Sequence, residues 1–214
     1  MNIQPPLNFG TLVSSMRIIL VRHGETDWNL EKKAQGHTDI PLNERGVRQA
    51  VAVAHHLRNL GRFNVLSSDL IRASETARII ADQLGTKHHE SPHLREQGFG
   101  IFEGKPYAEV GKELDSLSQK LQLPRHEVQP EDGESAKMVW NRIQPVIDSL
   151  CSDTIIVCHG GTIGLALAKL LGGDLSLARS FWFSNACVNE LERQRNGFAK
   201  LIRYNDVAHL KGIE

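Results

Sequence analysis

Apolar residues along the chain fall into two kinds of segment that alternate with each other. Short, continuous apolar runs occur at residues 16–22, 63–66 and 154–158, and runs of this length predict buried β-strands. Longer segments, in which apolar positions recur every three or four residues, lie between these runs and predict amphipathic helices. Strands that alternate with helices in this way are typical of an α/β fold with a mostly parallel sheet.

The predicted helices begin and end at residues with suitable capping chemistry. Asn43 is a suitable N-cap for the first helix, and either Asp132 or Ser135 for the third. Gly85 follows the second helix, as glycine commonly does at a helix C-terminus. The sequence therefore predicts helices at residues 43–57, 69–84, 132 or 135 to 150, and 162–171.

Two segments depart from this alternation. Residues 180–204 are typical of short strands around an Asn196-Gly197 turn, which predicts an antiparallel strand at the edge of the sheet. Residues 99–134 contain a helix-like stretch followed by a connection with prolines, and we expect a lid-like insertion there. Because no repeat or linker interrupts the remainder, residues 16–214 are predicted to form a single domain.

The first fifteen residues precede the first predicted strand and lack the basic and apolar regions of a signal peptide. They are interpreted as an N-terminal extension; the alternative is that translation starts at Met16. Further along the chain, the aromatic run of Phe181, Trp182 and Phe183 is expected in the core rather than around a ligand.

Composition narrows the classes of partner. Lys and Arg together number 25, as do Asp and Glu, so no overall charge favours nucleic acid or an anionic membrane. No apolar stretch approaches the ~20 residues of a membrane-spanning helix. Three cysteines, Cys151, Cys158 and Cys187, have no metal-binding spacing and form a poor disulfide framework. We therefore expect a cytoplasmic protein without a metal, a nucleic-acid partner or a membrane partner.

Polar residues follow the predicted strands at the points where ligands bind in α/β proteins. Arg22 and His23 end the first strand, Arg72 lies in the first turn of the helix after the second, and His159 follows the strand 154–158. The carboxyl ends of parallel strands share one edge of a sheet. Guanidinium groups and a helix N-terminus suit phosphate oxygens. The sequence therefore predicts a site for a phosphate-sized dianion.

Each of these residues has an ordinary structural explanation when it is taken alone. An arginine on a helix is commonly solvated, and a histidine at a strand end is commonly a hydrogen-bonded structural residue. Glu96, taken alone, is better interpreted as half of a surface salt bridge with Arg95. The functional interpretation therefore depends on the joint placement of the set.

Four motifs resemble those of the histidine phosphatase (phosphoglycerate mutase-like) superfamily. They are LVRHGETDWN at 20–29, SSDLIRASETA at 67–77, LREQGFGIFEG at 94–104 and VCHGGTI at 157–163. QGHTDIPLNERG at 35–46 and NAC at 185–187 are also similar to the family. The resemblance implies a three-layer α/β/α sandwich with a mostly parallel central sheet and an antiparallel edge strand.

The resemblance also implies roles for individual residues. His23 is expected to be the nucleophile that takes the phosphoryl group, and Glu96 the proton donor to the leaving oxygen and then the base for water. Arg22, Arg72 and a protonated His159 would complete the phosphate pocket. The residues expected to line the substrate side or support the phosphate are Asn29, Gln35, Gly36 and Gly160. No metal or cofactor is required by this chemistry.

Departures from the mutases of the family favour hydrolysis. Gln97-Gly98-Phe99-Gly100 stands where those mutases usually have Arg-His-Tyr-Gly, and Gly161-Thr162-Ile163-Gly164 replaces Asn-Ser-Leu-Arg. We therefore predict a phosphatase acting on a small phosphomonoester, with the physiological substrate left open. The alternatives are a cofactor-dependent phosphoglycerate mutase and an inactive binding protein of the family. The apolar segment 174–190 suits either a homodimer edge or the core.

Overall fold

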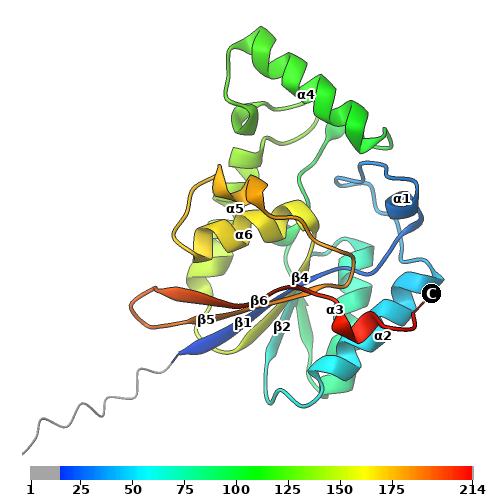
Figure 1. The fold of residues 1–214 in the computed structure, drawn as a ribbon, viewed down its shortest axis with the longest axis vertical. Helices are drawn as coiled ribbons and strands as arrows, with labels where there is room; N and C mark the ends of the chain where they lie inside the picture. Colours follow the sequence, from blue (N-terminus) through cyan, green and yellow to red (C-terminus); the bar gives the residue numbers. More distant parts are fainter. Residues whose placement is uncertain (1–14, 214) are drawn as a thin grey trace, which may run out of the picture.

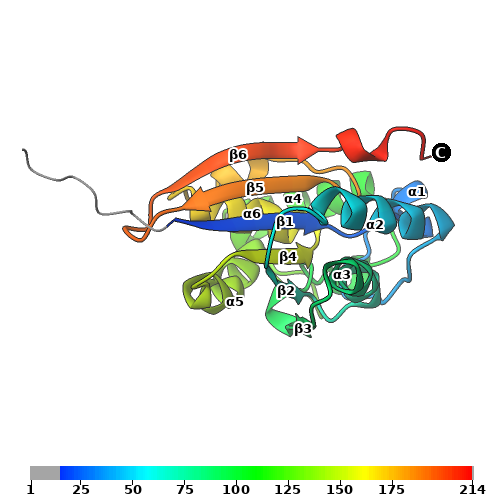
Figure 2. The same cartoon turned by 90° about the horizontal axis from the view of Figure 1, so that it is seen from below.

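A computed structural model describes residues 15–213, so the predicted N-terminal extension lies outside the described residues except for Ser15. A six-stranded sheet forms the centre of the molecule. Its strands are β1 (Met16–Arg22), β2 (Asn64–Ser67), β3 (His88–Glu90), β4 (Thr154–Cys158), β5 (Val188–Arg193) and β6 (Ala199–Asp206). They lie in the order β3-β2-β4-β1-β5-β6, as Figure 2 shows from the bottom of the view to the top.

The sheet is mostly parallel, as predicted. Strands β3, β2, β4 and β1 pair in parallel, whereas β5 is antiparallel to both β1 and β6. The antiparallel part is therefore a hairpin of two strands at one edge, with β6 outermost. This hairpin surrounds the Asn196-Gly197 turn that the sequence indicates.

Helices cover both faces of the sheet, which confirms the three-layer α/β/α sandwich. Helices α2 (Glu44–Leu57) and α3 (Ile71–Leu84) pack on one face, and α5 (Ala136–Ser149) and α6 (Gly160–Leu170) on the other. Side chains along β1 alternate between the two cores: Ile18 and Leu20 join α5 and α6, whereas Ile19 and Val21 join α2 and α3. This alternation follows from the two-residue period of a strand buried on both faces.

Capping residues set the helix boundaries. The Asn43 side chain accepts a hydrogen bond from Gly46 N at 2.8 Å, and Gly85 ends α3 in the left-handed conformation. Ser135, rather than Asp132, caps α5. Helix α6 begins at Gly160, two residues before the predicted start, because His159 is its N-cap. The histidine is thereby fixed at the junction of β4 and α6.

Residues 99–134 carry helix α4 (Tyr107–Leu121) and 3-10 turns on either side of it. Figure 1 shows α4 at the top of the view, set apart from the sheet. The segment has a small apolar cluster of its own, made by Ala34, Phe102, Val110, Leu114 and Val128. The short helix α1 (Asp27–Leu30) follows β1.

The prediction for the aromatic run was wrong at Trp182. Phe183 is buried, but Trp182 is 67% exposed. Its backbone N–H donates to the Tyr204 hydroxyl at 2.9 Å, and that hydroxyl donates to the Trp182 carbonyl at 2.8 Å. The backbone is thus tied to β6 while the indole faces outward. Among residues 15–213, no helix is long and apolar enough to cross a membrane.

Candidate active site

Three strands of the sheet end side by side, and their hydrogen bonds continue past the strand ends. Ser68 N donates to the Val157 carbonyl at 3.0 Å, and His23 N donates to the Cys158 carbonyl at 3.0 Å. The residues that follow β1, β2 and β4 are therefore held at one edge of the sheet. This edge is where the polar residues singled out in the sequence meet.

His23 is held in one tautomer by the backbone. Its Nδ1 lies 2.6 Å from the Gly24 carbonyl oxygen, so Nδ1 carries the proton and donates it there. The ring is buried, and burial together with the charges of Arg72 and Arg22 lowers its pKa well below 6.5. A neutral imidazole with protonated Nδ1 has its lone pair on Nε2. His23 is therefore arranged as a nucleophile, with the backbone carbonyl partner that such a role requires.

The two arginines each use part of their guanidinium to hold the structure. Arg72 is 1% exposed and donates from Nη1 to Thr38 O at 3.0 Å and from Nη2 to Gly36 O at 2.8 Å. Arg22 donates from Nη1 to Phe183 O at 2.6 Å. The buried Nε of each arginine has no hydrogen-bond partner among the described residues. Both groups are thus fixed in place and keep donors for an anion.

His159 lies beside His23, with ring centroids 5.2 Å apart. It is fully buried, and neither of its ring nitrogens has a hydrogen-bond partner within residues 15–213. Burial lowers its pKa well below 6.5, and the charges of Arg72 and Arg22 lower it further. We therefore expect a neutral His159 in the free protein, and the protonated His159 stays a prediction for the phosphate-bound state.

Glu96 is buried rather than part of a surface salt bridge. Its carboxylate accepts hydrogen bonds from Gly161 N at 3.0 Å and Thr162 N at 3.2 Å, the first backbone donors of α6. The Thr162 hydroxyl also donates to it at 3.3 Å. Arg95 instead pairs with Asp69, at 2.7 and 2.5 Å. The start of α6 therefore carries His159 and the Glu96 carboxylate together.

Two of the predicted substrate-side residues present amide groups. Asn29 Oδ1 accepts from Thr26 N at 3.1 Å and from Asn185 Nδ2 at 3.0 Å, which fixes its orientation. Gln35 is 3% exposed, and its buried Oε1 has no partner among the described residues. An unpaired buried amide oxygen is costly, so it indicates a place where a ligand donor is accommodated.

The two predicted glycines act through the backbone. Gly36 has a φ of +52°, and a Cβ there would lie 2.0 Å from Glu103 Oε1, while its carbonyl accepts from Arg72. Gly160 opens α6, and a Cβ there would lie 3.7 Å from Arg22 Nε. Gly36 therefore supports Arg72, and Gly160 lies close to Arg22.

Glu103 is a supporting residue that sequence reasoning missed. Its carboxylate accepts from His37 N at 2.8 Å, Thr38 N at 2.9 Å and Phe99 N at 3.0 Å, and from the Thr38 hydroxyl. It therefore fixes the loop whose carbonyls hold Arg72. Its place in the GFGIFEG stretch was the only available signal.

The lid-like segment also brings Tyr107 to the site. Burial and the Glu96 carboxylate raise the pKa of the Tyr107 hydroxyl, whereas Arg22 and Arg72 lower it. The phenol group is thus within electrostatic reach of three site residues. Its ring meets Phe99 edge to face, with centroids 6.2 Å apart. Phe99 and Tyr107 therefore form an aromatic pair within the lid-like segment.

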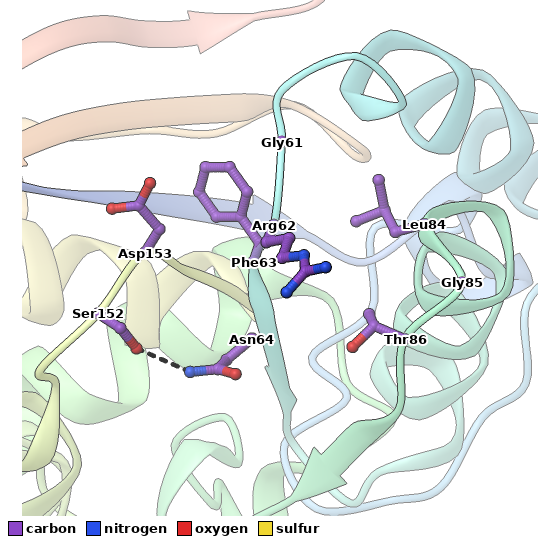
Figure 3. Close-up of a pocket in the computed structure, with 9 residues that line it drawn as sticks. All are labelled: Gly61, Arg62, Phe63, Asn64, Leu84, Gly85, Thr86, Ser152 and Asp153. Atoms are coloured by element: carbon purple, nitrogen blue, oxygen red, sulfur yellow. Dashed lines mark hydrogen bonds between the residues drawn. The ribbon is translucent and has the colours of Figure 1, made fainter.

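A separate cavity of about 490 Å³ lies at the opposite edge of the sheet, where β2 and β4 begin. Figure 3 shows that it is bounded by Phe63, Asn64 and the end of α3, with Asn64 bonded to Ser152 at 2.8 Å. Asp153 there already accepts from Arg17 N at 2.9 Å. No histidine lines this cavity, so it lacks the paired histidines found where β1 and β4 end.

The fold and this set of side chains define an α/β protein in which two buried histidines and two arginines meet at the carboxyl edge of the sheet. No group of three or more histidine, cysteine or acidic residues within 15–213 is arranged to hold a metal ion. A family model described as histidine phosphatase superfamily (branch 1) matches residues 18–207. The chain belongs to the histidine phosphatase superfamily.

Similar proteins include a mutase and several phosphatases. A protein named probable phosphoglycerate mutase from Yersinia pestis (strain Pestoides F) is 33% identical over 186 residues, which cover 85% of this chain and 86% of that protein. This chain is thus similar to a protein that is named for the mutase reaction.

Solved structures of phosphatases superpose over most of the chain. The α-ribazole phosphatase from Shigella flexneri gives a TM-score of 0.77 at 28% identity, covering 89% of this chain and 96% of that one. Mycobacterial glucosyl-3-phosphoglycerate phosphatase gives 0.77 at 26%, covering 90% and 99%. Phosphoserine phosphatase from Entamoeba histolytica, in complex with 3-phosphoglyceric acid, gives 0.75 at 30%, covering 91% and 99%.

Proposed function

We propose that this protein is a phosphatase that hydrolyses a small phosphomonoester through a phosphohistidine intermediate. The observation that carries the proposal is the state of His23, which is neutral, buried and fixed with Nδ1 on the Gly24 carbonyl. A histidine needs an unprotonated nitrogen to attack phosphorus, and this arrangement supplies it at neutral pH. The proposal includes no metal ion and no cofactor.

In the first step, Nε2 of His23 forms a bond to phosphorus as the bond from phosphorus to the ester oxygen breaks. Glu96 gives its proton to the departing oxygen, so that an alcohol leaves rather than an alkoxide. Arg22 and Arg72 balance the charge on the three equatorial oxygens of the transferring group. His159 adds a hydrogen bond, and it gains a proton most readily when the phosphate charge is beside it.

In the second step, a water oxygen attacks phosphorus and the bond to His23 Nε2 breaks. Glu96 takes a proton from that water, which restores the acid for the next cycle. Phosphate then leaves, and His23 returns to its neutral form. The place of Glu96 at the start of α6, next to His159, supports the assignment of both proton transfers to this carboxyl group.

A phosphoglycerate mutase is the second candidate, and the 33% identity to the Yersinia protein favours it. Such an enzyme must keep water from the phosphohistidine and hold a bisphosphate intermediate. Gln97 and Gly164 stand where the corresponding segments of the family's mutases have arginine, and neither residue adds positive charge. This lack of added charge favours hydrolysis over retention of a second phosphate.

One assay separates the two reactions. The purified protein is given p-nitrophenyl phosphate and a panel of phosphomonoesters with EDTA present, and the release of phosphate is measured. The panel includes α-ribazole phosphate, glucosyl-3-phosphoglycerate, phosphoserine and 3-phosphoglycerate, chosen from the chemistry of the similar proteins. We expect hydrolysis of at least one ester. Interconversion of phosphoglycerates that depends on a bisphosphate primer, without net phosphate release, would establish the mutase instead.

A further inference from the structure

Arg142, on α5, contacts the segment that carries Glu96 although it lies outside the four motifs. Its guanidinium is mostly buried, with a side-chain exposure of 16%. It donates to the backbone carbonyls of His93 at 2.7 Å, Arg95 at 2.8 Å and Glu96 at 2.8 Å. One planar group therefore fixes the backbone of the turn from which the Glu96 side chain extends.

Glu134 holds Arg142 in that orientation. Arg142 donates from Nε to Glu134 Oε1 at 2.9 Å and from Nη2 to Oε2 at 3.0 Å, a two-pronged contact that fixes the plane of the guanidinium. Burial opposes the charge on Glu134, but hydrogen bonds from His37 and Arg142 lower its pKa to about 2. The Glu134 carboxylate is therefore ionised throughout the neutral range.

Glu134 also connects the two ends of the lid-like segment, through both its carboxylate and its backbone. Gly98 N donates to Glu134 Oε2 at 3.1 Å, and Glu134 N donates to the Gly98 carbonyl at 2.7 Å. Gln97 Nε2 donates to the Glu134 carbonyl at 2.6 Å. His37 adds a second contact to the Glu96 carbonyl, at 2.9 Å. Residues before, inside and after the lid thus converge on the backbone of Glu96.

We infer that Glu134 and Arg142 are positioning residues, which set where the Glu96 carboxyl group meets the departing ester oxygen. The inference rests on the phosphatase function proposed above. The Glu96 side chain is held at its carboxylate by the N–H groups of α6 and at its backbone by Arg142, so its carboxyl group keeps its position only while both contacts are in place. Displacements of about 1 Å at a catalytic group cost roughly 10²-fold in rate.

Esters whose leaving groups differ in basicity can separate the positioning of Glu96 from a general loss of activity. An alkyl ester needs a proton on its departing oxygen, whereas p-nitrophenolate leaves as a stable anion. A variant that misplaces Glu96 therefore loses more rate with the alkyl ester. A variant that only loosens the fold or the phosphate pocket loses the same factor with both. The comparison uses kcat/KM, because that quantity reports the step in which the alcohol departs.

The test variants are Arg142→Lys, which keeps the positive charge but loses the planar guanidinium, and Glu134→Gln, which keeps the size but loses the negative charge. The matched controls are Arg17→Lys and Glu190→Gln. Arg17 donates to Glu190 Oε1 from Nε at 2.9 Å and from Nη2 at 2.8 Å, and this pair lies at the other end of β1 from His23. Controls and test variants therefore remove the same kind of contact.

The full-length protein is assayed with p-nitrophenyl phosphate and with the alkyl ester of the panel that the wild type hydrolyses fastest. We expect both test variants to lose about 10²-fold in kcat/KM with the alkyl ester but less than about 5-fold with p-nitrophenyl phosphate. The controls should lose less than about 3-fold with either. An equal loss with both esters, or no loss with either, would overturn the positioning role alone. A wild type inactive on both esters would overturn the proposed function, and this role with it.

Discussion

The imidazole rings of His23 and His159 lie with centroids 5.2 Å apart and planes inclined by 59°, and both rings are buried. Burial lowers the pKa of each well below 6.5, and Arg72 lowers both further. The two imidazoles are therefore neutral together. Charge for the site comes from the guanidiniums, and the histidines serve as a nucleophile and as a neutral hydrogen-bonding group until an anion arrives.

The first prediction concerns the tautomer of His23. Because Nδ1 donates to the Gly24 carbonyl and the pKa is lowered, the ring should stay in the Nδ1–H form at pH 6.5 and below. Long-range ¹H–¹⁵N spectra of the imidazoles of the free protein check this, with His23→Ala used to assign the signals. A His23 ring that gains its second proton at or above pH 6.5 would contradict the geometry.

The second prediction concerns the phosphoenzyme. Rapid acid quenching of the wild type with a labelled ester should trap an acid-labile, base-stable phosphohistidine. His23→Ala should abolish the label and lower kcat by at least about 10³-fold, since the nucleophile is lost. His159→Gln is the control, because it leaves Nε2 of His23 in place and should still form the label, more slowly. Label that persists in His23→Ala would identify another nucleophile.

The third prediction follows from the neutral His159. A bound dianion beside the ring favours its protonated form, so binding should be accompanied by proton uptake between pH 6 and 7. Sulfate is the suitable probe because it does not titrate in this range. Calorimetry in two buffers of different ionisation enthalpy measures the uptake. His159→Gln should remove it, and a wild type that binds sulfate without proton uptake would refute the coupling.

The fourth prediction concerns the backbone behind Arg72. Gly36→Ala adds a Cβ 2.0 Å from Glu103 Oε1 at a residue with positive φ, so both strain and a clash follow. We expect the free energy of unfolding to fall by about 3 kcal/mol or more. Gly85→Ala is the matched control, with positive φ and open space around the new Cβ, and should cost about 1 kcal/mol. Urea unfolding measures both, and equal losses would count against the clash.

Sequence periodicity was sufficient for β1, β2 and β4, after whose carboxyl ends the motif residues lie. Arg22, Arg72 and His159 could be placed because each follows a strand with a continuous apolar run, and parallel strands share their carboxyl edge. The start of α6 was misplaced because a histidine without a side-chain capping bond is an uncommon N-cap. The exposure of Trp182 was not predicted because the contacts that fix this residue are made by its backbone to Tyr204, and its ring is left outside the core.

Supporting contacts could not be predicted from sequence because they join segments far apart along the chain. Glu103 accepts from residues 65 and 66 positions earlier, and Arg142 reaches carbonyls 46 to 49 positions earlier. A glutamate and an arginine at such spacings carry no periodic signal. Burial and the charges of Arg72 and Arg22 lower the pKa of His159 in the free protein, whereas its predicted protonated form concerns the phosphate-bound site.

The fifth prediction concerns the pH dependence of stability at Glu134. Its pKa is lowered from 4.5 to about 2 in the folded protein by His37 and Arg142, against the effect of burial. A carboxyl group whose pKa is lower in the folded protein than in the unfolded chain stabilises the fold when the pH is above its unfolded pKa. This contribution is lost as the pH falls through 4.5 toward 2.

Glu134→Gln should therefore lower the free energy of unfolding by about 2 kcal/mol at pH 6, after allowance for screening of a half-buried group. The difference in unfolding free energy between wild type and variant should shrink between pH 5 and pH 3, as measured by urea unfolding. Glu190→Gln is the control, because it removes another carboxylate that is paired with arginine. If the difference in unfolding free energy between the wild type and Glu134→Gln stayed constant from pH 5 to pH 3, the Glu134 charge would not stabilise the fold.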